Sequence, residues 1–138
     1  AGGRTAVTPE RVAINLMDAR IPDNTGYQPI DEPIAPDGPA AYFSTLPVKA
    51  IAERIQSAGL PAVVSNTAGT YVCNNLLYTL LHTAALEYPG LRGGFLHVPY
   101  AIEQLPGKPG DTFGMKLCDI ARALTCAVEA IAEHLLER

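Results

Sequence analysis

Cys73 is the side chain of this 138-residue chain whose type and surroundings best suit nucleophilic chemistry. It follows an apolar, β-branched run at 60–65, which predicts a buried strand, and the small-residue turn Thr67-Ala68-Gly69-Thr70. Apolar residues then recur at helical spacing as far as Ala84. Free N–H groups and the positive dipole end at a helix start stabilise an anion, so this position favours a thiolate. A small buried cysteine at a helix start is the alternative interpretation.

Two further cysteines and two of the histidines lack neighbours that would give them a chemical role. Cys118 and Cys126 lie on a predicted final helix, about 12 Å apart along its axis. That separation is too large for a disulfide, so we expect both residues in the core. His82 and His134 lie on predicted helices without liganding neighbours. The sequence therefore predicts no metal site.

Three longer segments occur in a fixed order along the chain. The first combines RVAIN at 11–15 with DARIPDN at 18–24, and Glu10 precedes it directly. The second is SNTAGTYVCN at 65–74, and the third is GFLHVPY at 94–100. In residues, order and spacing they resemble the signatures of the type I pyroglutamyl peptidases (pyrrolidone-carboxylate peptidases). The resemblance is dense as far as residue 104 and only compositional beyond it.

The resemblance implies a catalytic triad. Cys73 would be the nucleophile, His97 the base that takes its proton, and Glu10 the carboxylate that orients His97, the three parts that a thiol hydrolase needs. By residue type alone, Glu10 would instead be a solvated carboxylate in a helix turn that begins at Thr8-Pro9. Arg20 is compatible both with a surface salt bridge and with a place near the oxyanion. Val72 is the residue expected to touch the substrate ring.

The resemblance also implies a substrate and a mechanism. The substrate would be a peptide with an N-terminal pyroglutamyl residue, cleaved through a thioester intermediate with no cofactor and no metal. The resemblance further implies a homo-oligomer, either a dimer or a tetramer. The chain would correspond to the C-terminal two-thirds or so of the family domain, with the aromatic part of the substrate pocket upstream of Ala1.

Two other classes of function are compatible with the sequence. The first is a catalytically silent fragment or scaffold of the same family that lacks a complete substrate pocket. The second is a nucleoside- or small-molecule-binding α/β domain, which rests on fold analogy alone. The first would keep the triad without turnover, and in the second Cys73 would tolerate replacement.

Composition and charge limit the partners and the compartment. Hydrophobic residues make up 48% of the chain and charged residues 17%, which is ordinary for a globular domain. The net charge of −4 gives no indication of nucleic acid or an anionic membrane as a partner. No apolar run is long enough to span a bilayer. Three cysteines without a CxxC pair fit a reducing compartment, so we expect a cytoplasmic protein.

The elements that must position these residues indicate one α/β domain over residues 1–138. A strand and a helix alternate three times, at residues 12–17, 45–58, 60–65, 73–88, 93–100 and 113–137. This order implies a three-layer α/β/α fold with a mostly parallel, mixed and twisted sheet, and the family resemblance implies that it is of the phosphorylase/hydrolase-like kind. Cys73 and His97 are expected at the carboxyl edge of that sheet, and the strand after Glu10 is expected to run antiparallel. The proline-rich segment 18–44 is predicted to be an arm or lid bordering the site.

Overall fold

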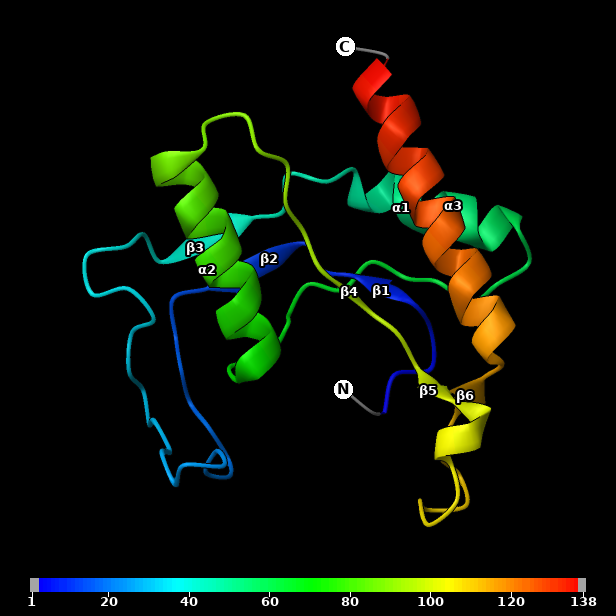
Figure 1. Cartoon of the computed structure of the whole chain (residues 1–138), viewed down its shortest axis with the longest axis horizontal. Coiled ribbons are helices and arrows are strands. Elements are labelled where there is room, and N and C mark those ends of the chain that lie inside the picture. Colours follow the sequence, from blue (N-terminus) through cyan, green and yellow to red (C-terminus); the bar gives the residue numbers. More distant parts are fainter. Residues whose placement is uncertain (1–2, 137–138) are drawn as a thin grey trace. The chain divides into compact units, whose positions relative to one another are not determined.

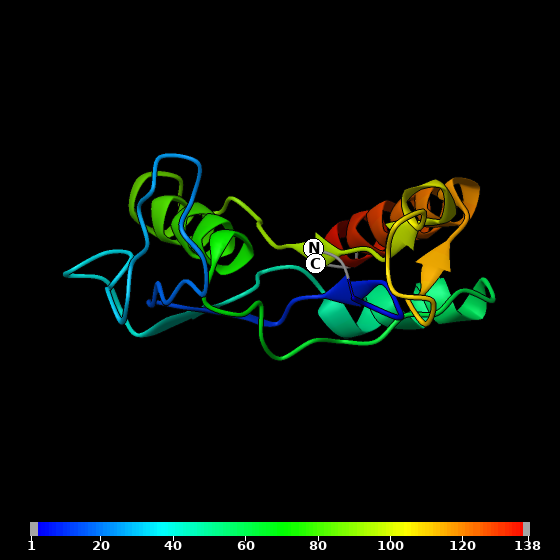
Figure 2. The ribbon, with the colours of Figure 1, turned by 90° about the horizontal axis from the view of Figure 1, so that it is seen from below.

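Two sets of chain segments make up the computed structural model, which describes residues 3–136 (Figures 1 and 2). Each set has its own apolar core. Within the described residues, unit 1 consists of 3–9, 46–65 and 96–136. Unit 2 consists of 10–45 and 66–95. The boundaries separate Glu10 and Cys73, which belong to unit 2, from His97, which belongs to unit 1.

Two helices that pack against each other form the main core of unit 1. They are α1 (Val48–Ser57) and α3 (Leu117–Leu136). The face of α1 that carries Ile51 and Ile55 is fully buried, and α3 meets it with small side chains such as Ala123 and Ala127. Small residues on this face of α3 let the two helices approach closely, and Ile120 of α3 adds a larger buried side chain to the same core. Within residues 3–136, no helix is long and apolar enough to cross a membrane.

The short strands of unit 1 pair in two ways. β1 (Thr8–Pro9) and β4 (Leu96–His97) are antiparallel. β5 (Tyr100–Ala101) and β6 (Gly114–Met115) are parallel and flank a short 3-10 turn. The predicted strand at 60–65 runs parallel to residues 7–9, because backbone hydrogen bonds of 3.0 to 3.1 Å join the two segments. Only one bridge of a parallel ladder is complete there, between Val7 and Ala62.

Unit 2 is a helix on a two-stranded sheet. α2 (Val72–Glu87) packs on β2 (Val12–Ile14) and β3 (Ala41–Phe43), which pair antiparallel. Its buried face carries Leu77, Tyr78 and Leu81, which contact Ala13 of β2. The long segment between the two strands folds back on itself through a bridge from Met17 to Glu32.

Several predicted boundaries are wrong for reasons that lie in tertiary contacts. Thr8-Pro9 starts no helix, because these residues pair with β4. The helix predicted from residue 45 begins only after Pro47, and the Thr45 hydroxyl accepts the N–H of Gly93 at 2.7 Å. The predicted strand 93–100 is split at Pro99, which has no N–H to donate to a ladder. Cys126 is buried as expected, whereas Cys118 is exposed at the start of α3 rather than in the core.

Gly38 is the glycine of unit 2 that has the least room for a side chain. A Cβ at this position would overlap the Tyr78 hydroxyl and lie 2.9 Å from the Cβ of Ala35. Tyr78 cannot move aside easily, because it is fully buried and donates a 2.7 Å hydrogen bond to the carbonyl of Pro39. We expect Gly38→Ala to lower the free energy of unfolding by about 1–3 kcal/mol, measured by denaturant titration.

The matched control for this prediction is Gly110→Ala. No atom of the described residues lies within 4 Å of a Cβ at Gly110, so its free energy of unfolding should hardly change. Adding Tyr78→Phe to Gly38→Ala removes the overlapping oxygen and should recover part of the loss. Equal stabilities of the two alanine variants would contradict the packing described here.

Candidate functional site

Cys73 lies at the start of α2, as its second residue, and is half-buried. The turn before it depends on Gly69, whose φ of 80° lies in the region that side chains disfavour. Among the described residues, no side chain caps the start of the helix at Tyr71. The first N–H groups of α2 are therefore not taken up by a capping side chain, which is the arrangement that favours an anion at this end. The turn and the helix that were predicted around Cys73 are therefore confirmed.

The chain on both sides of Cys73 is hydrogen-bonded to the segment that follows Glu10. Before it, the Thr70 carbonyl accepts the N–H of Asp18 at 2.9 Å, and the Thr70 hydroxyl donates to the Asp18 carbonyl at 2.8 Å. After it, the buried Asn74 side chain makes three hydrogen bonds to the backbone of residues 14 and 16. Asn74 is a residue of this site that the sequence motifs do not single out. A polar residue on the same helical stripe as Leu77 and Leu81 is the signal that would have found it.

Glu10 lies in unit 2, between β1 and β2, and its side chain is completely buried. Its backbone N–H donates to the Phe95 carbonyl at 2.8 Å. The interpretation of Glu10 as a solvated carboxylate in a helix turn is therefore wrong, since no helix turn forms and no side-chain surface is exposed. A fully buried carboxylate is costly unless the fold provides partners for it, so this burial is unusual for a glutamate.

His97 lies in unit 1, on β4, and is only 5% exposed. Its register partner across the ladder is Thr8 of β1. The guanidinium of Arg4 lies 3.5 Å from Nδ1 of His97 and 3.4 Å from the hydroxyl of Ser65. Antiparallel pairing with β1 and the nearby guanidinium of Arg4 are thus part of the surroundings of this imidazole within unit 1.

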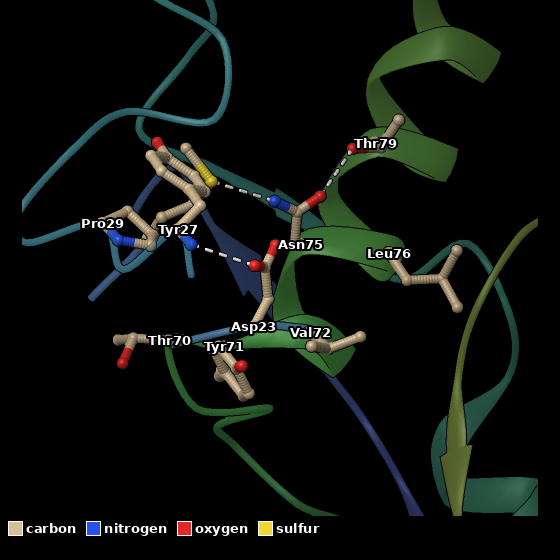
Figure 3. A pocket seen from close by; sticks show the side chains of 10 residues that line it. Asp23, Tyr27, Pro29, Thr70, Tyr71, Val72, Asn75, Leu76 and Thr79 are labelled. Carbon is tan, nitrogen blue, oxygen red and sulfur yellow. Dashed lines mark hydrogen bonds between the residues drawn. The ribbon is translucent and has the colours of Figure 1, made fainter. Parts of the chain in front are cut away.

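Arg20 and Val72 both have exposed side chains in unit 2. Val72 lines a pocket of about 430 Å³, and Arg20 does not (Figure 3). The walls come from the long segment after β2 and from the start of α2, including Asp23, Tyr27, Pro29, Tyr71, Val72 and Leu76. The segment predicted as an arm therefore forms one wall of a pocket whose other wall leads directly into Cys73.

Asp23 gives this pocket a charged rim. Its carboxylate accepts hydrogen bonds from the Thr25 hydroxyl at 2.7 Å, the Thr25 N–H at 2.8 Å and the Tyr27 N–H at 3.0 Å. The Thr25 hydroxyl is the main cause that lowers the pKa of Asp23 below its ordinary value. Because the folded pKa is depressed, the carboxylate stays charged to a lower pH than an ordinary aspartate. Across the loop, a 2.7 Å hydrogen bond to Glu32 raises the pKa of Tyr27.

The histidine on α2 has a packing role. Nδ1 of His82 lies 2.9 Å from the Tyr42 hydroxyl, and its ring stacks on Tyr78 at 5.7 Å. Burial raises the pKa of Tyr78, whose hydroxyl is engaged with the Pro39 carbonyl. Over residues 3–136, no three histidine, cysteine or acidic side chains gather closely enough to hold a metal ion.

Comparison with known proteins gives one consistent result. Residues 1–134 match the pyroglutamyl peptidase family, and the chain belongs to this family. It is 58% identical over 134 residues to a pyrrolidone-carboxylate peptidase of Streptococcus pneumoniae (strain 70585), covering 97% of this chain and 62% of that protein. It is 56% identical over 131 residues to one from Levilactobacillus brevis, covering 95% and 64% respectively. The chain thus spans a little over three-fifths of these relatives' length.

Solved structures agree with the sequence comparison. Pyroglutamyl peptidase I from Bacillus amyloliquefaciens superposes with a TM-score of 0.90 at 51% identity, over 96% of this chain and 62% of that one. Pyrrolidone carboxyl peptidase from Thermococcus litoralis superposes with a TM-score of 0.94 at 42% identity, over 99% of this chain and 64% of that one. The predicted α/β fold class is therefore confirmed.

Proposed function

We propose that this protein is a cysteine peptidase, a pyroglutamyl-peptidase I, that hydrolyses the amide bond after an N-terminal pyroglutamyl residue. The observation that carries the proposal is Cys73 at the start of α2 in a chain that belongs to the pyroglutamyl peptidase family. A thiol at this position is next to N–H groups that stabilise both a thiolate and an oxyanion. The burial of Glu10 and His97 supports roles for these two side chains in the same reaction.

The proposed reaction has two steps. In the first, the Cys73 sulfur attacks the carbonyl carbon of the amide bond that follows the pyroglutamyl residue, and His97 takes the thiol proton. The N–H of Cys73 stabilises the oxyanion that forms. The C–N bond then breaks, His97 gives the proton to the leaving amine, and a thioester remains on Cys73. In the second step, His97 activates a water molecule that hydrolyses the thioester to pyroglutamate. Glu10 orients the imidazole and stabilises its charged form.

Specificity for pyroglutamate follows from the chemistry of its lactam ring. The ring N–H and carbonyl are suited to backbone hydrogen bonds, and the ring carbons are suited to apolar side chains such as Val72. An ordinary N-terminal residue brings a charged α-amine, whose desolvation in such a pocket is costly. Arg20 is proposed as a second group near the oxyanion, and its exposed guanidinium is available for that role.

Assembly and location belong to the same proposal. We propose that the protein works in the cytoplasm as a homo-oligomer, a dimer or tetramer. Large exposed apolar side chains support contact with another subunit, among them Ile30, Phe43 and Leu86, each at least 68% exposed.

A pair of substrates tests the proposal directly. The chain is incubated with a pyroglutamyl amide of a fluorescent amine and, as a matched control, with the prolyl amide of the same amine. Proline has the same five-membered ring but carries a charged amine instead of a lactam. We expect fluorescence to be released from the first substrate only. A folded chain that releases no amine would contradict catalysis by this chain and favour the catalytically silent alternative, and equal release from both would contradict lactam specificity.

A further inference from the structure

We propose that Asn74 is a positioning residue that holds Cys73 in the geometry needed for nucleophilic attack. This inference rests on the proposed function, because it concerns the same thiol. Asn74 follows Cys73 directly in the first turn of α2, and its side chain is only 1% exposed. A carboxamide buried to this extent is costly unless all its hydrogen bonds are made.

The Asn74 carboxamide binds the end of β2 through three hydrogen bonds. Its Oδ1 accepts the N–H of Ile14 at 2.9 Å, and its Nδ2 donates to the carbonyls of Ile14 at 2.9 Å and Leu16 at 3.1 Å. Both amide hydrogens and the amide oxygen are therefore engaged. The Asn74 side chain bonds both the N–H and the carbonyl of Ile14, as the backbone of a neighbouring strand would.

The second observation is the independent attachment on the other side of Cys73. Thr70 is joined to Asp18 by two hydrogen bonds, of 2.9 and 2.8 Å. The chain is thus held three residues before the thiol and one residue after it, in both cases by the segment 14–18. Asn74 is the attachment nearer to Cys73. Among the described residues, the hydrogen bonds that would then still join the start of α2 to this segment are those of Thr70 and a 3.0 Å contact from Asn75 to the Met17 sulfur.

This arrangement has a chemical consequence. The sulfur and the N–H groups at the helix start must keep a fixed relation to the carbonyl that is attacked, and a misplacement of about 1 Å can cost about 100-fold in rate. Loss of the Asn74 hydrogen bonds frees the backbone that carries both groups. It should therefore affect the chemical step more than substrate binding.

A matched pair of variants separates positioning from stability. Asn15→Ala is the control for Asn74→Ala, because Asn15 makes the same set of three backbone hydrogen bonds. Its Oδ1 accepts the N–H of Ala35 at 2.9 Å, and its Nδ2 donates to the carbonyls of Ala35 at 2.7 Å and Gly38 at 3.3 Å. Both asparagines thus join another segment to the end of β2, but the bonds of Asn15 lead to the loop before β3 instead of α2.

Two readouts are measured in the full chain. The first is the rate at which iodoacetamide alkylates Cys73, followed against pH by mass spectrometry of the peptide that contains it. The second is amine release from the pyroglutamyl amide, resolved into kcat and KM. We expect both variants to unfold at lower denaturant concentration. Only Asn74→Ala should move the alkylation profile to higher pH and lower kcat by about 100-fold, with KM changed by less than about threefold.

The result that would overturn the inference is an Asn74→Ala protein whose Cys73 alkylation profile matches that of Asn15→Ala. Should Asn74→Ala fail to fold, Asn74→Asp takes its place, because it keeps the volume and the acceptor for Ile14 but loses both donors. A parent chain that releases no amine would refute the proposed function and not this inference, since the alkylation profiles still decide whether Asn74 controls the thiol.

Discussion

Replacement of Cys73 by serine is expected to abolish release of amine from a pyroglutamyl amide, with a fall in kcat/KM of at least about 1,000-fold. A serine hydroxyl at this position is far less acidic than a thiol, so the helix start cannot maintain a nucleophilic anion there. The side chain is half-buried and differs from serine by one atom, so the fold should persist. The measurement is initial rate against substrate concentration, with circular dichroism and unfolding curves to compare the folded states.

The two other cysteines provide the controls. Cys118→Ser and Cys126→Ser make the same chemical change on α3, in the exposed and the buried position respectively. Both should keep turnover, although Cys126→Ser should be less stable because it places a hydroxyl in the core of unit 1. Undiminished turnover by Cys73→Ser would refute the nucleophile assignment, and loss of turnover in Cys118→Ser would point to a different thiol.

The features that could be predicted from the sequence are those set by local signals. The start of α2 is one of them, because a glycine-containing turn followed by apolar residues at helical spacing is a signal that adjacent residues carry by themselves. The end of this helix at Glu87, just before Pro89, is another. The element on which Cys73 lies could therefore be predicted from the chain alone.

The features that could not be predicted depend on partners distant in the sequence. Thr8-Pro9 has the form of a helix start, but pairing with β4, far along the chain, makes it a strand. Thr45 has the form of a cap, but its hydroxyl is used by Gly93. Propensity is a weak preference that such contacts override. The burial of Glu10 likewise follows from packing, because an isolated acidic residue near a proline is usually solvated.

The role proposed for Asn74 also depends on partners that are distant in the sequence. A residue that directly follows a proposed nucleophile is easily interpreted as part of a motif, with no role of its own. Its position on the buried stripe of α2 and its three bonds to β2 show that it joins two elements. The hydrogen-bond partners of a polar side chain in a helix stripe are set by the neighbouring strand, which the helix sequence does not specify.

Glu10→Gln is expected to lower kcat by about 10² to 10⁴-fold while leaving measurable activity with an altered pH profile. Glutamine keeps the shape of the completely buried side chain but removes the negative charge that is proposed to orient and stabilise the His97 imidazolium. The control is Glu53→Gln, on the exposed side of α1, which makes the same change away from the proposed triad. The measurement is kcat and kcat/KM over the pH range in which the parent is folded.

A Glu10→Gln protein that matches the parent at every pH would refute the orienting role. If the variant loses both its activity and its folded state, the unfolding curves of variant and parent must be compared before the triad is judged. That comparison is decisive, because an orienting carboxylate changes the pH profile of a chain that is still folded, and a carboxylate that only supports packing does not.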